Sequence, residues 1–160
     1  MAVYLLRHAH AGSRHDWKGP DDERPLSKKG WREAEGFAEA VAGADDDVDR
    51  VTCILSSPSR RCVQTVEPLA KALGLEIEEV PALCEGADID AAVELVRQAE
   101  RSTWVLCTHG DVGPPLLDAL CAADGLDLPA GSRFQKGAAW LLEADENGRF
   151  RRARYLPPRH

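Results

Sequence analysis

The sequence predicts an α/β protein, a three-layer α/β/α sandwich around a mostly parallel sheet with an antiparallel edge. Short apolar runs typical of buried strands alternate with segments of helical periodicity through most of the 160 residues. Strands that alternate with helices form parallel sheets covered on both faces. Near the end of the chain, Asn147-Gly148 separates two strand-like runs and indicates a hairpin, which adds the antiparallel edge.

The strands are expected where apolar or β-branched runs are bounded by polar or glycine-containing segments. The first run ends abruptly at Arg7-His8, and a later one ends at Thr108-His109-Gly110. The arginines of the last run should face water, because this run pairs back as an edge strand. The expected strands are residues 2–6, 51–55, 75–80, 103–107, 138–142 and 150–156.

The helices are expected where apolar side chains recur every three or four residues between start and stop signals. Ser27 is placed to cap the first helix, which should end at Gly43. Gly74 should end the second helix, and Pro68 should kink or restart it. The expected helical segments are residues 28–42, 62–73, 88–101 and 114–121.

The connections are expected where Gly, Pro and charged residues gather. The polar segment from Gly12 to Pro25 is long for a connection, and loops of this length are usually functional or disordered. The acidic stretch 44–49 is expected to be a solvated turn. Residues 81–87 and 122–132 are expected to be a loop and an irregular segment.

The composition predicts one ordinary globular domain, residues 1–160, with 44% hydrophobic residues to build a core. The formal net charge of -7 argues against nucleic-acid binding, although a local basic pocket can still bind an anion. No apolar run is long enough to span a membrane and no signal peptide is recognised, so a cytoplasmic protein is the expectation. We expect all five cysteines to be reduced.

Cationic side chains follow three of the expected strands. Arg7-His8 comes after the first, Arg60-Arg61 after the second, and His109 after residues 103–107. In an open α/β sheet, ligands bind beyond the carboxyl ends of the strands, so these groups should meet at one edge. Cations packed together are costly unless an anion lies between them, and phosphate suits arginine best.

Histidine among arginines indicates chemistry as well as binding. A neutral imidazole can attack phosphorus and form a phosphohistidine intermediate. Neighbouring arginines would keep the imidazole neutral and stabilise charge on the equatorial oxygens in the transition state. A carboxylic acid would then protonate the leaving group. Neither a metal nor another cofactor is expected, because arginines repel cations and no ligand spacing is present.

Four segments together resemble the histidine phosphatase superfamily, which has the phosphoglycerate mutase-like fold. Arg7-His8-Ala9 is similar to its R-H-G/A signature, and Thr108-His109-Gly110 to its second-histidine segment. Residues 57–65 resemble S-P-x-x-R-A-x-Q-T, a register that selects Arg61 rather than Arg60. Residues 24–30 resemble R-P-L-T-x-x-G. The length is most similar to the compact SixA-type branch, which is linked to phosphohistidine dephosphorylation.

The resemblance implies roles for individual residues. His8 would be the nucleophile, while Arg7, Arg61 and His109 would complete a catalytic phosphate pocket. Glu85 is either the general acid or a loop residue, because compact members often lack a glutamate at this position.

Three further side chains are candidate substrate contacts. His10 is either a pocket-wall group or a loop histidine, and Arg14 and Arg24 either reach outer anions of a substrate or pair with the acidic run 21–23.

The function expected from these residues is a metal-independent phosphatase that acts through phospho-His8. Its substrate partner would be a phosphohistidine protein or a small phosphomonoester. The opening residues also resemble phosphatase domains fused to Nudix hydrolases, so hydrolysis of nucleotide di- or polyphosphates is an alternative. A non-catalytic module that binds a phosphorylated ligand is the third hypothesis.

Overall fold

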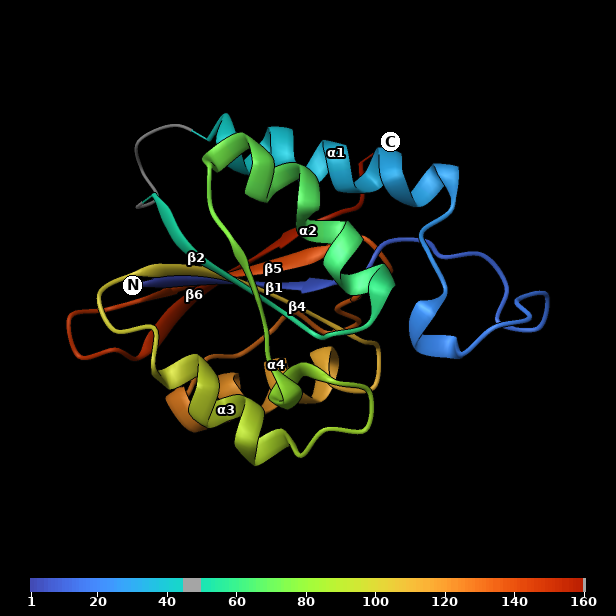
Figure 1. The fold of residues 1–160 in the computed structure, drawn as a ribbon. Coiled ribbons are helices and arrows are strands. Elements are labelled where there is room, and N and C mark those ends of the chain that lie inside the picture. The colour runs from blue at the N-terminus through green and yellow to red at the C-terminus, as the bar shows by residue number, and fades with distance from the viewer. Residues whose placement is uncertain (45–49, 160) are drawn as a thin grey trace.

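The chain folds around a six-stranded sheet with the strand order β3-β2-β4-β1-β5-β6. This computed structural model describes residues 1–44 and 50–159 (Figure 1). The strands are β1 Ala2–Arg7, β2 Val51–Ser56, β3 Ile77–Glu79, β4 Thr103–Thr108, β5 Ala139–Ala144 and β6 Phe150–Leu156. The α-helices are α1 Lys28–Ala42, α2 Arg60–Leu73, α3 Ile89–Arg97 and α4 Gly113–Asp124. Short 3-10 helices span Asp21–Glu23 and Pro81–Leu83.

Helices cover both faces of the sheet, which confirms the predicted three layers. Figure 1 shows α1 and α2 on one side and α3 and α4 on the other. Val3 and Leu5 of β1 belong to the core beneath α3 and α4, whereas Tyr4 and Leu6 belong to the core beneath α1 and α2. Because side chains alternate along a strand, a strand that is buried on both faces must be apolar throughout.

The pairing of β1 decides where the polar strand ends meet. β1 runs parallel to β4 and antiparallel to β5, so the predicted mixture of parallel sheet and antiparallel edge is confirmed. Arg7 pairs with Thr108 in the β1–β4 register, which makes His8 and His109 neighbours immediately beyond the two strands. Figure 1 shows the long loop after β1 at this same end of the sheet.

Most element ends agree with the sequence expectations. Ser27 caps α1 through a hydrogen bond that its side chain accepts from the Gly30 N–H, and Gly43 follows the last turn. Gly74 ends α2 in the left-handed conformation, with φ at 67°. The arginines of β6 are exposed at the sheet edge, as predicted. All five cysteines are free thiols.

Other ends were predicted wrongly. α3 stops at Arg97 rather than at residue 101, because the chain turns there to enter β4, and Arg101 adopts a positive φ of 55°. α4 continues to Asp124, within the segment expected to be irregular, because Asp124 pairs with Arg97 across the two helices. α2 starts at Arg60 and runs through Pro68 without restarting.

β3 is also shorter than expected, and the predicted acidic turn at 44–49 lies largely outside the described residues.

Candidate active site

The end of β1 is held from both sides, so the backbone of the Arg7-His8 pair has a defined position. The His8 N–H donates to the Thr108 carbonyl at 3.0 Å. The Arg7 N–H donates to the Ala138 carbonyl at 3.0 Å, and the Gly137 N–H contacts both the Arg7 and His8 carbonyls. Two side chains can therefore project from the strand end with little backbone freedom.

The His8 ring is buried, with 6% of its surface exposed. Its Nδ1 lies 2.9 Å from the Ala9 carbonyl. Because a carbonyl can only accept, Nδ1 carries the proton and Nε2 keeps its lone pair. Burial lowers the pKa of His8 to about 3; the hydrogen bond to Ala9 opposes this, and the charges of Arg61, His109 and Arg7 add to it. At neutral pH His8 is a neutral imidazole with Nε2 available for attack.

The Arg7 guanidinium lies against the backbone of Gly110. A Cβ at that glycine would come within 2.6 Å of Arg7 Nη2, so no larger residue fits there without moving the arginine. Arg7 Nη1 donates to the Phe134 carbonyl at 2.9 Å. Its Nε–H is buried and has no hydrogen-bond partner in the part of the chain that the structure describes.

Arg61 is the arginine of α2 that enters the site, whereas Arg60 is exposed. Only 1% of the Arg61 surface is exposed, and Arg61 Nη1 donates to the Asp21 carbonyl at 2.8 Å. Its Nη2 donates to the carboxylates of Asp21 at 3.1 Å and Glu85 at 3.3 Å. The Nε–H of Arg61 is likewise buried without a partner among residues 1–44 and 50–159.

His109 stands beside His8, with the two ring centroids 5.4 Å apart. It is 2% exposed. Its Nε2 lies 2.8 Å from the Ser57 hydroxyl and 3.6 Å from the Cys62 sulfur, while its Nδ1 lies 3.4 Å from Arg61 Nη2. The second histidine is therefore oriented by groups from β2 and α2.

Acidic side chains form the outer side of the site. Glu85 accepts from Arg14 at 3.0 Å as well as from Arg61, and its side chain is 45% exposed. Asp21 pairs with Arg14, Arg24 and Arg61. Burial raises the pKa of Asp21, but the positive charge of Arg61 and the hydrogen bond from Arg24 outweigh this and lower it. Asp21 therefore remains a carboxylate that balances three guanidinium groups.

These groups surround a hollow of about 360 Å³ at the carboxyl ends of β1 and β4, here called the carboxyl-end pocket. Arg14 and Arg24 line it and pair with Asp21 at the same time, so both of the alternatives considered for them agree with the structure. Lys136, which sequence reasoning missed, also lines it. The lining residues are Arg7, His8, Gly12, Arg14, Arg24, Arg61, Glu85, His109, Gly110, Asp111 and Lys136.

His10 is not among the lining residues. Its ring Nδ1 lies 2.7 Å from the Ser27 hydroxyl, and its N–H donates to Glu33 at 3.0 Å. The first turn of α1 packs directly on its backbone, because a Cβ at Gly30 would reach the His10 carbonyl. His10 therefore contacts α1, and only His8 of this histidine pair lines the pocket.

Other residues of the 57–65 segment hold loops around the pocket. The Thr65 hydroxyl accepts from the Ala9 N–H at 3.0 Å and donates to the Arg61 carbonyl at 2.6 Å. The Gln64 side-chain carbonyl accepts from the Leu26 N–H at 2.8 Å. This segment therefore positions the residues after β1 and the start of α1 as well as Arg61.

The electrostatics of the pocket fit an anion. Arg7, Lys136 and three more arginines line it, against the carboxylates Glu85 and Asp111. Within the described residues only three buried side-chain polar atoms lack a hydrogen-bond partner, and two of them are the Nε atoms of Arg7 and Arg61. Because buried donors normally have partners, these two mark capacity reserved for a ligand with acceptor oxygens.

A metal site is not apparent. In residues 1–44 and 50–159, no group of three His, Cys, Asp or Glu side chains is arranged to hold an ion. No helix in that part of the chain is long and apolar enough to cross a membrane.

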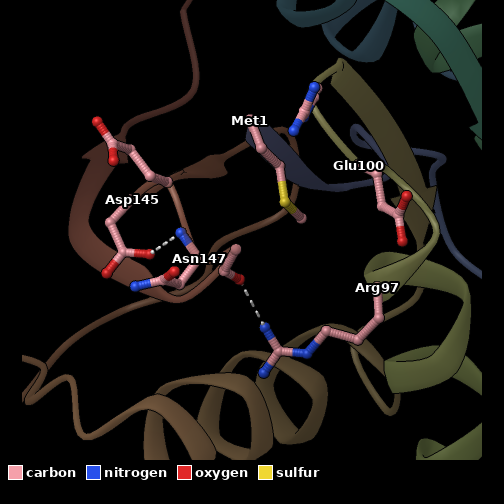
Figure 2. Close-up of a pocket in the computed structure, with 8 residues that line it drawn as sticks. Met1, Arg97, Glu100, Asp145 and Asn147 are labelled. Atoms are coloured by element: carbon pink, nitrogen blue, oxygen red, sulfur yellow. Dashed lines mark hydrogen bonds between the residues drawn. The ribbon is translucent and has the colours of Figure 1, made fainter.

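A second and larger hollow, about 910 Å³, lies at the amino ends of β1 and β4 and is here called the amino-end pocket. Figure 2 shows Met1, Arg97, Glu100, Asp145 and Asn147 around it. Arg97 donates to the Gly148 carbonyl at 3.4 Å and to both carboxylate oxygens of Asp124, at 2.9 and 2.8 Å.

Comparison with known proteins identifies relatives of the whole described fold. The family model of the histidine phosphatase superfamily (branch 1) matches residues 3–88. The structure of the protein histidine phosphatase SixA complexed with tungstate is similar at a TM-score of 0.77, with 23% identity and 96% of each chain covered. A putative phosphohistidine phosphatase SixA from Agrobacterium tumefaciens also reaches 0.77, with 30% identity and coverage of 98% and 97%.

A curated relative extends the comparison to nucleotides. An 8-oxo-(d)GTP phosphatase of Mycolicibacterium smegmatis is 34% identical over 161 residues, which are 98% of this chain and 48% of the relative. The chain thus spans about half the length of the curated relative it matches.

Proposed function

Because the chain belongs to the histidine phosphatase superfamily, we propose that it is a metal-independent phosphatase that transfers a phosphoryl group to His8 and then to water. One observation carries the proposal. His8 is buried and neutral with a lone pair on Nε2, and it lines the same pocket as Arg7 and Arg61, whose Nε–H donors have no partner among the described residues. A nucleophile and preset donors for phosphoryl oxygens are the two things that phosphoryl transfer requires.

In the first step, His8 Nε2 attacks phosphorus as the bond to the leaving group breaks. The bonding pair departs with the leaving group, which takes a proton from Glu85 when that side chain is in its carboxylic acid form. Arg7, Arg61 and His109 stabilise the charge on the three equatorial oxygens. In the second step, water attacks the phosphorus of phospho-His8, the N–P bond breaks, and Glu85 accepts the proton of the water. Phosphate and neutral His8 are the products.

Phosphohistidine on a protein or a small phosphomonoester is the proposed substrate. The 30% identical structural relative is a putative phosphohistidine phosphatase, which supports the first choice. Glu85 is nearly half exposed, so the leaving group lies toward solvent, where the side chain of another protein could reach. An imidazole leaving group needs less help from an acid than an alkoxide does.

Hydrolysis of a nucleotide di- or polyphosphate is the second candidate. The curated relative is named for a nucleotide substrate, and this chain matches half of it. Arg14 and Lys136 add cations at the pocket beyond Arg7 and Arg61, and these could bind a second phosphate.

The mechanism can be tested with a generic aryl phosphate in EDTA. Turnover should continue without metal and should fall by at least about 10³-fold in His8→Ala, because the nucleophile is lost. Acid-labile, base-stable phosphate should be trapped on His8 in a brief reaction. Glu100→Ala, at the amino-end pocket, is the matched control and should keep full activity. Activity that requires a divalent metal, or that survives His8→Ala, would contradict the mechanism.

The substrate can be tested with a panel of phosphohistidine peptide, nucleoside diphosphates and triphosphates, and sugar phosphates. Glu85→Gln should slow phosphoester hydrolysis more than phosphohistidine hydrolysis, because only the alkoxide needs the proton. Phosphate binding without turnover on any member would instead favour the non-catalytic binding module.

A further inference from the structure

The Ser57 hydroxyl is a buried polar group with one important neighbour. Ser57 directly follows β2 and has none of its surface exposed. Its N–H donates to the Cys107 carbonyl at 3.0 Å, which fixes the backbone against β4. Its Oγ lies 2.8 Å from His109 Nε2 and accepts from the Ser59 N–H at 3.3 Å. Among residues 1–44 and 50–159, the hydroxyl hydrogen therefore has one neighbour that could accept it, His109 Nε2.

The hydrogen bonds of Arg61 also leave Nδ1 of His109 free to carry the ring proton. Arg61 Nη2 carries two hydrogens, and it has two carboxylate acceptors, Asp21 and Glu85. The 3.4 Å approach to His109 Nδ1 is longer than either of these and would need a third hydrogen. Nδ1 of His109 therefore has no need to accept from Arg61.

Neutral His109 can carry its ring proton on either Nε2 or Nδ1. With the proton on Nε2, two donors would face one acceptor: the ring N–H and the Ser59 N–H would both point at Ser57 Oγ, and the hydroxyl hydrogen would be buried without an acceptor. With the proton on Nδ1, the hydroxyl donates to Nε2, and the ring N–H faces the carboxyl-end pocket, where solvent or a phosphoryl oxygen can accept it. The first arrangement buries a donor without a partner, which favours the second.

We propose that Ser57 is a positioning residue that keeps the proton of neutral His109 on Nδ1, where the N–H faces the phosphoryl oxygens. His109 lines the carboxyl-end pocket, and its Nδ1 lies on the side of Arg61, whereas Nε2 lies on the buried side of Ser57 and Cys62. The catalytic consequence rests on the proposed function, but the proton position does not. His8 then presents the lone pair of Nε2 to the phosphoryl group, and His109 presents the N–H of Nδ1.

Cys62 is the other group that touches Nε2, at 3.6 Å, and it serves as the matched control. It is fully buried, like Ser57, and a thiol is a weak donor. Cys62→Ala removes a small polar group from the same nitrogen while leaving the Ser57 hydroxyl in place. Burial raises the pKa of Cys62, but hydrogen bonds with Cys107 and His109 and the charges of His109 and Arg61 outweigh this and lower it below the usual thiol value. A thiolate there would attract the ring proton to Nε2, and Cys62→Ala removes this competing acceptor.

The wild-type protein tests the proton position directly. Long-range ¹H–¹⁵N correlation spectra of ¹⁵N-histidine protein distinguish a protonated ring nitrogen from one with a lone pair, and His109→Gln assigns the signals. We expect Nδ1 protonated and Nε2 bare, with and without inorganic phosphate. A proton on Nε2 in the wild-type spectrum would overturn the proposal, even if His8→Ala abolishes turnover and the proposed function stands.

The variants test whether Ser57 is responsible. Ser57→Ala should shift the ring proton partly or wholly to Nε2 and lower kcat about 10- to 100-fold with little change in KM, because a transition-state donor is lost. Cys62→Ala should keep the proton on Nδ1 and keep kcat within about 3-fold. Ser57→Thr, which restores the hydroxyl, should restore the wild-type ring signals. An unchanged tautomer in folded Ser57→Ala would also overturn the proposal.

Discussion

The two hollows at opposite ends of the sheet differ in whether their arginines are satisfied. The amino-end pocket is the larger, at about 910 Å³ against about 360 Å³. In it, Arg97 is matched to Asp124 and to a backbone carbonyl and lies over the Phe150 ring at 5.4 Å. In the carboxyl-end pocket, Arg7 and Arg61 each have a buried Nε–H with no partner among the described residues. Unmet hydrogen-bonding capacity therefore distinguishes the candidate site, and volume does not.

The direction of the strands explains the difference. β1 and β4 are parallel and in register, so both histidines leave the sheet at the same end. The amino ends receive the turns after α3 and between β5 and β6, whose polar groups bond to one another. The polar groups at the carboxyl end of the sheet are thus available to a ligand, whereas those at the amino end bond to one another.

Exchanging an arginine for alanine at each end should give opposite results. Arg61→Ala should lower kcat/KM about 10²- to 10³-fold, because a donor to the transition state is lost. Arg97→Ala should leave activity unchanged but lower the free energy of unfolding by about 2–3 kcal/mol, because the nearly buried Asp124 loses its cation. Aryl phosphate hydrolysis and urea unfolding measure the two effects. Equal losses of activity in both variants would remove the distinction between the pockets.

The pH dependence of stability should report the buried His8. Its pKa is about 3 in the folded protein against 6.5 for a free side chain, so between these values only the unfolded chain binds the proton. Stability from this residue is therefore highest above pH 6.5 and falls as the pH drops toward 3, by about 3 kcal/mol at pH 4.5.

His8→Gln provides the control for this pH effect. The variant cannot take up the proton in either state, so its free energy of unfolding should fall less between pH 7 and pH 4.5 than that of the wild type. Urea titrations at the two pH values measure the difference. Identical pH dependence in the two proteins would show that His8 titrates normally in the folded state.

The smallest expected effect concerns the outer part of the carboxyl-end pocket. Burial lowers the pKa of Lys136, and the charges of Arg7 and three more arginines lower it further, which places its amine among the pocket cations. If a second phosphate binds there, Lys136→Ala should lower kcat/KM for a nucleoside diphosphate about 5-fold and for an aryl phosphate less than 2-fold. Lys71→Ala, exposed on α2, is the control. Equal effects on both substrates would argue against a second phosphate site.

Much of the fold was predictable because a strand that is buried on both faces of the sheet appears in the sequence as a continuous apolar run. β1 and β4 are largely apolar runs, and a histidine directly follows each of them. The caps of α1 and α2 were predictable because Ser27 and Gly74 act on their own helix. The placement of Arg7, His8, Arg61 and His109 in one pocket followed from the rule that parallel strands share their carboxyl ends.

Other features depend on contacts between distant segments and have no local signal. α3 ends early and α4 runs on because of how both helices meet the sheet and each other. The pairing of Asp21 with Arg61 joins residues 40 positions apart. Lys136 lies outside the four motifs of the sequence analysis, so only the packing of the chain before β5 brings it to the pocket.

By itself, the sequence determined the order of strands and helices and the identity of the groups at the strand ends, because these depend on neighbours along the chain. Only the tertiary structure decided the protonation of those groups. The proton of His8 lies on Nδ1 because the Ala9 carbonyl is within 2.9 Å, and the orientation of His109 depends on Ser57, 52 residues away. Proton positions follow from distances between atoms, and folding alone sets those distances.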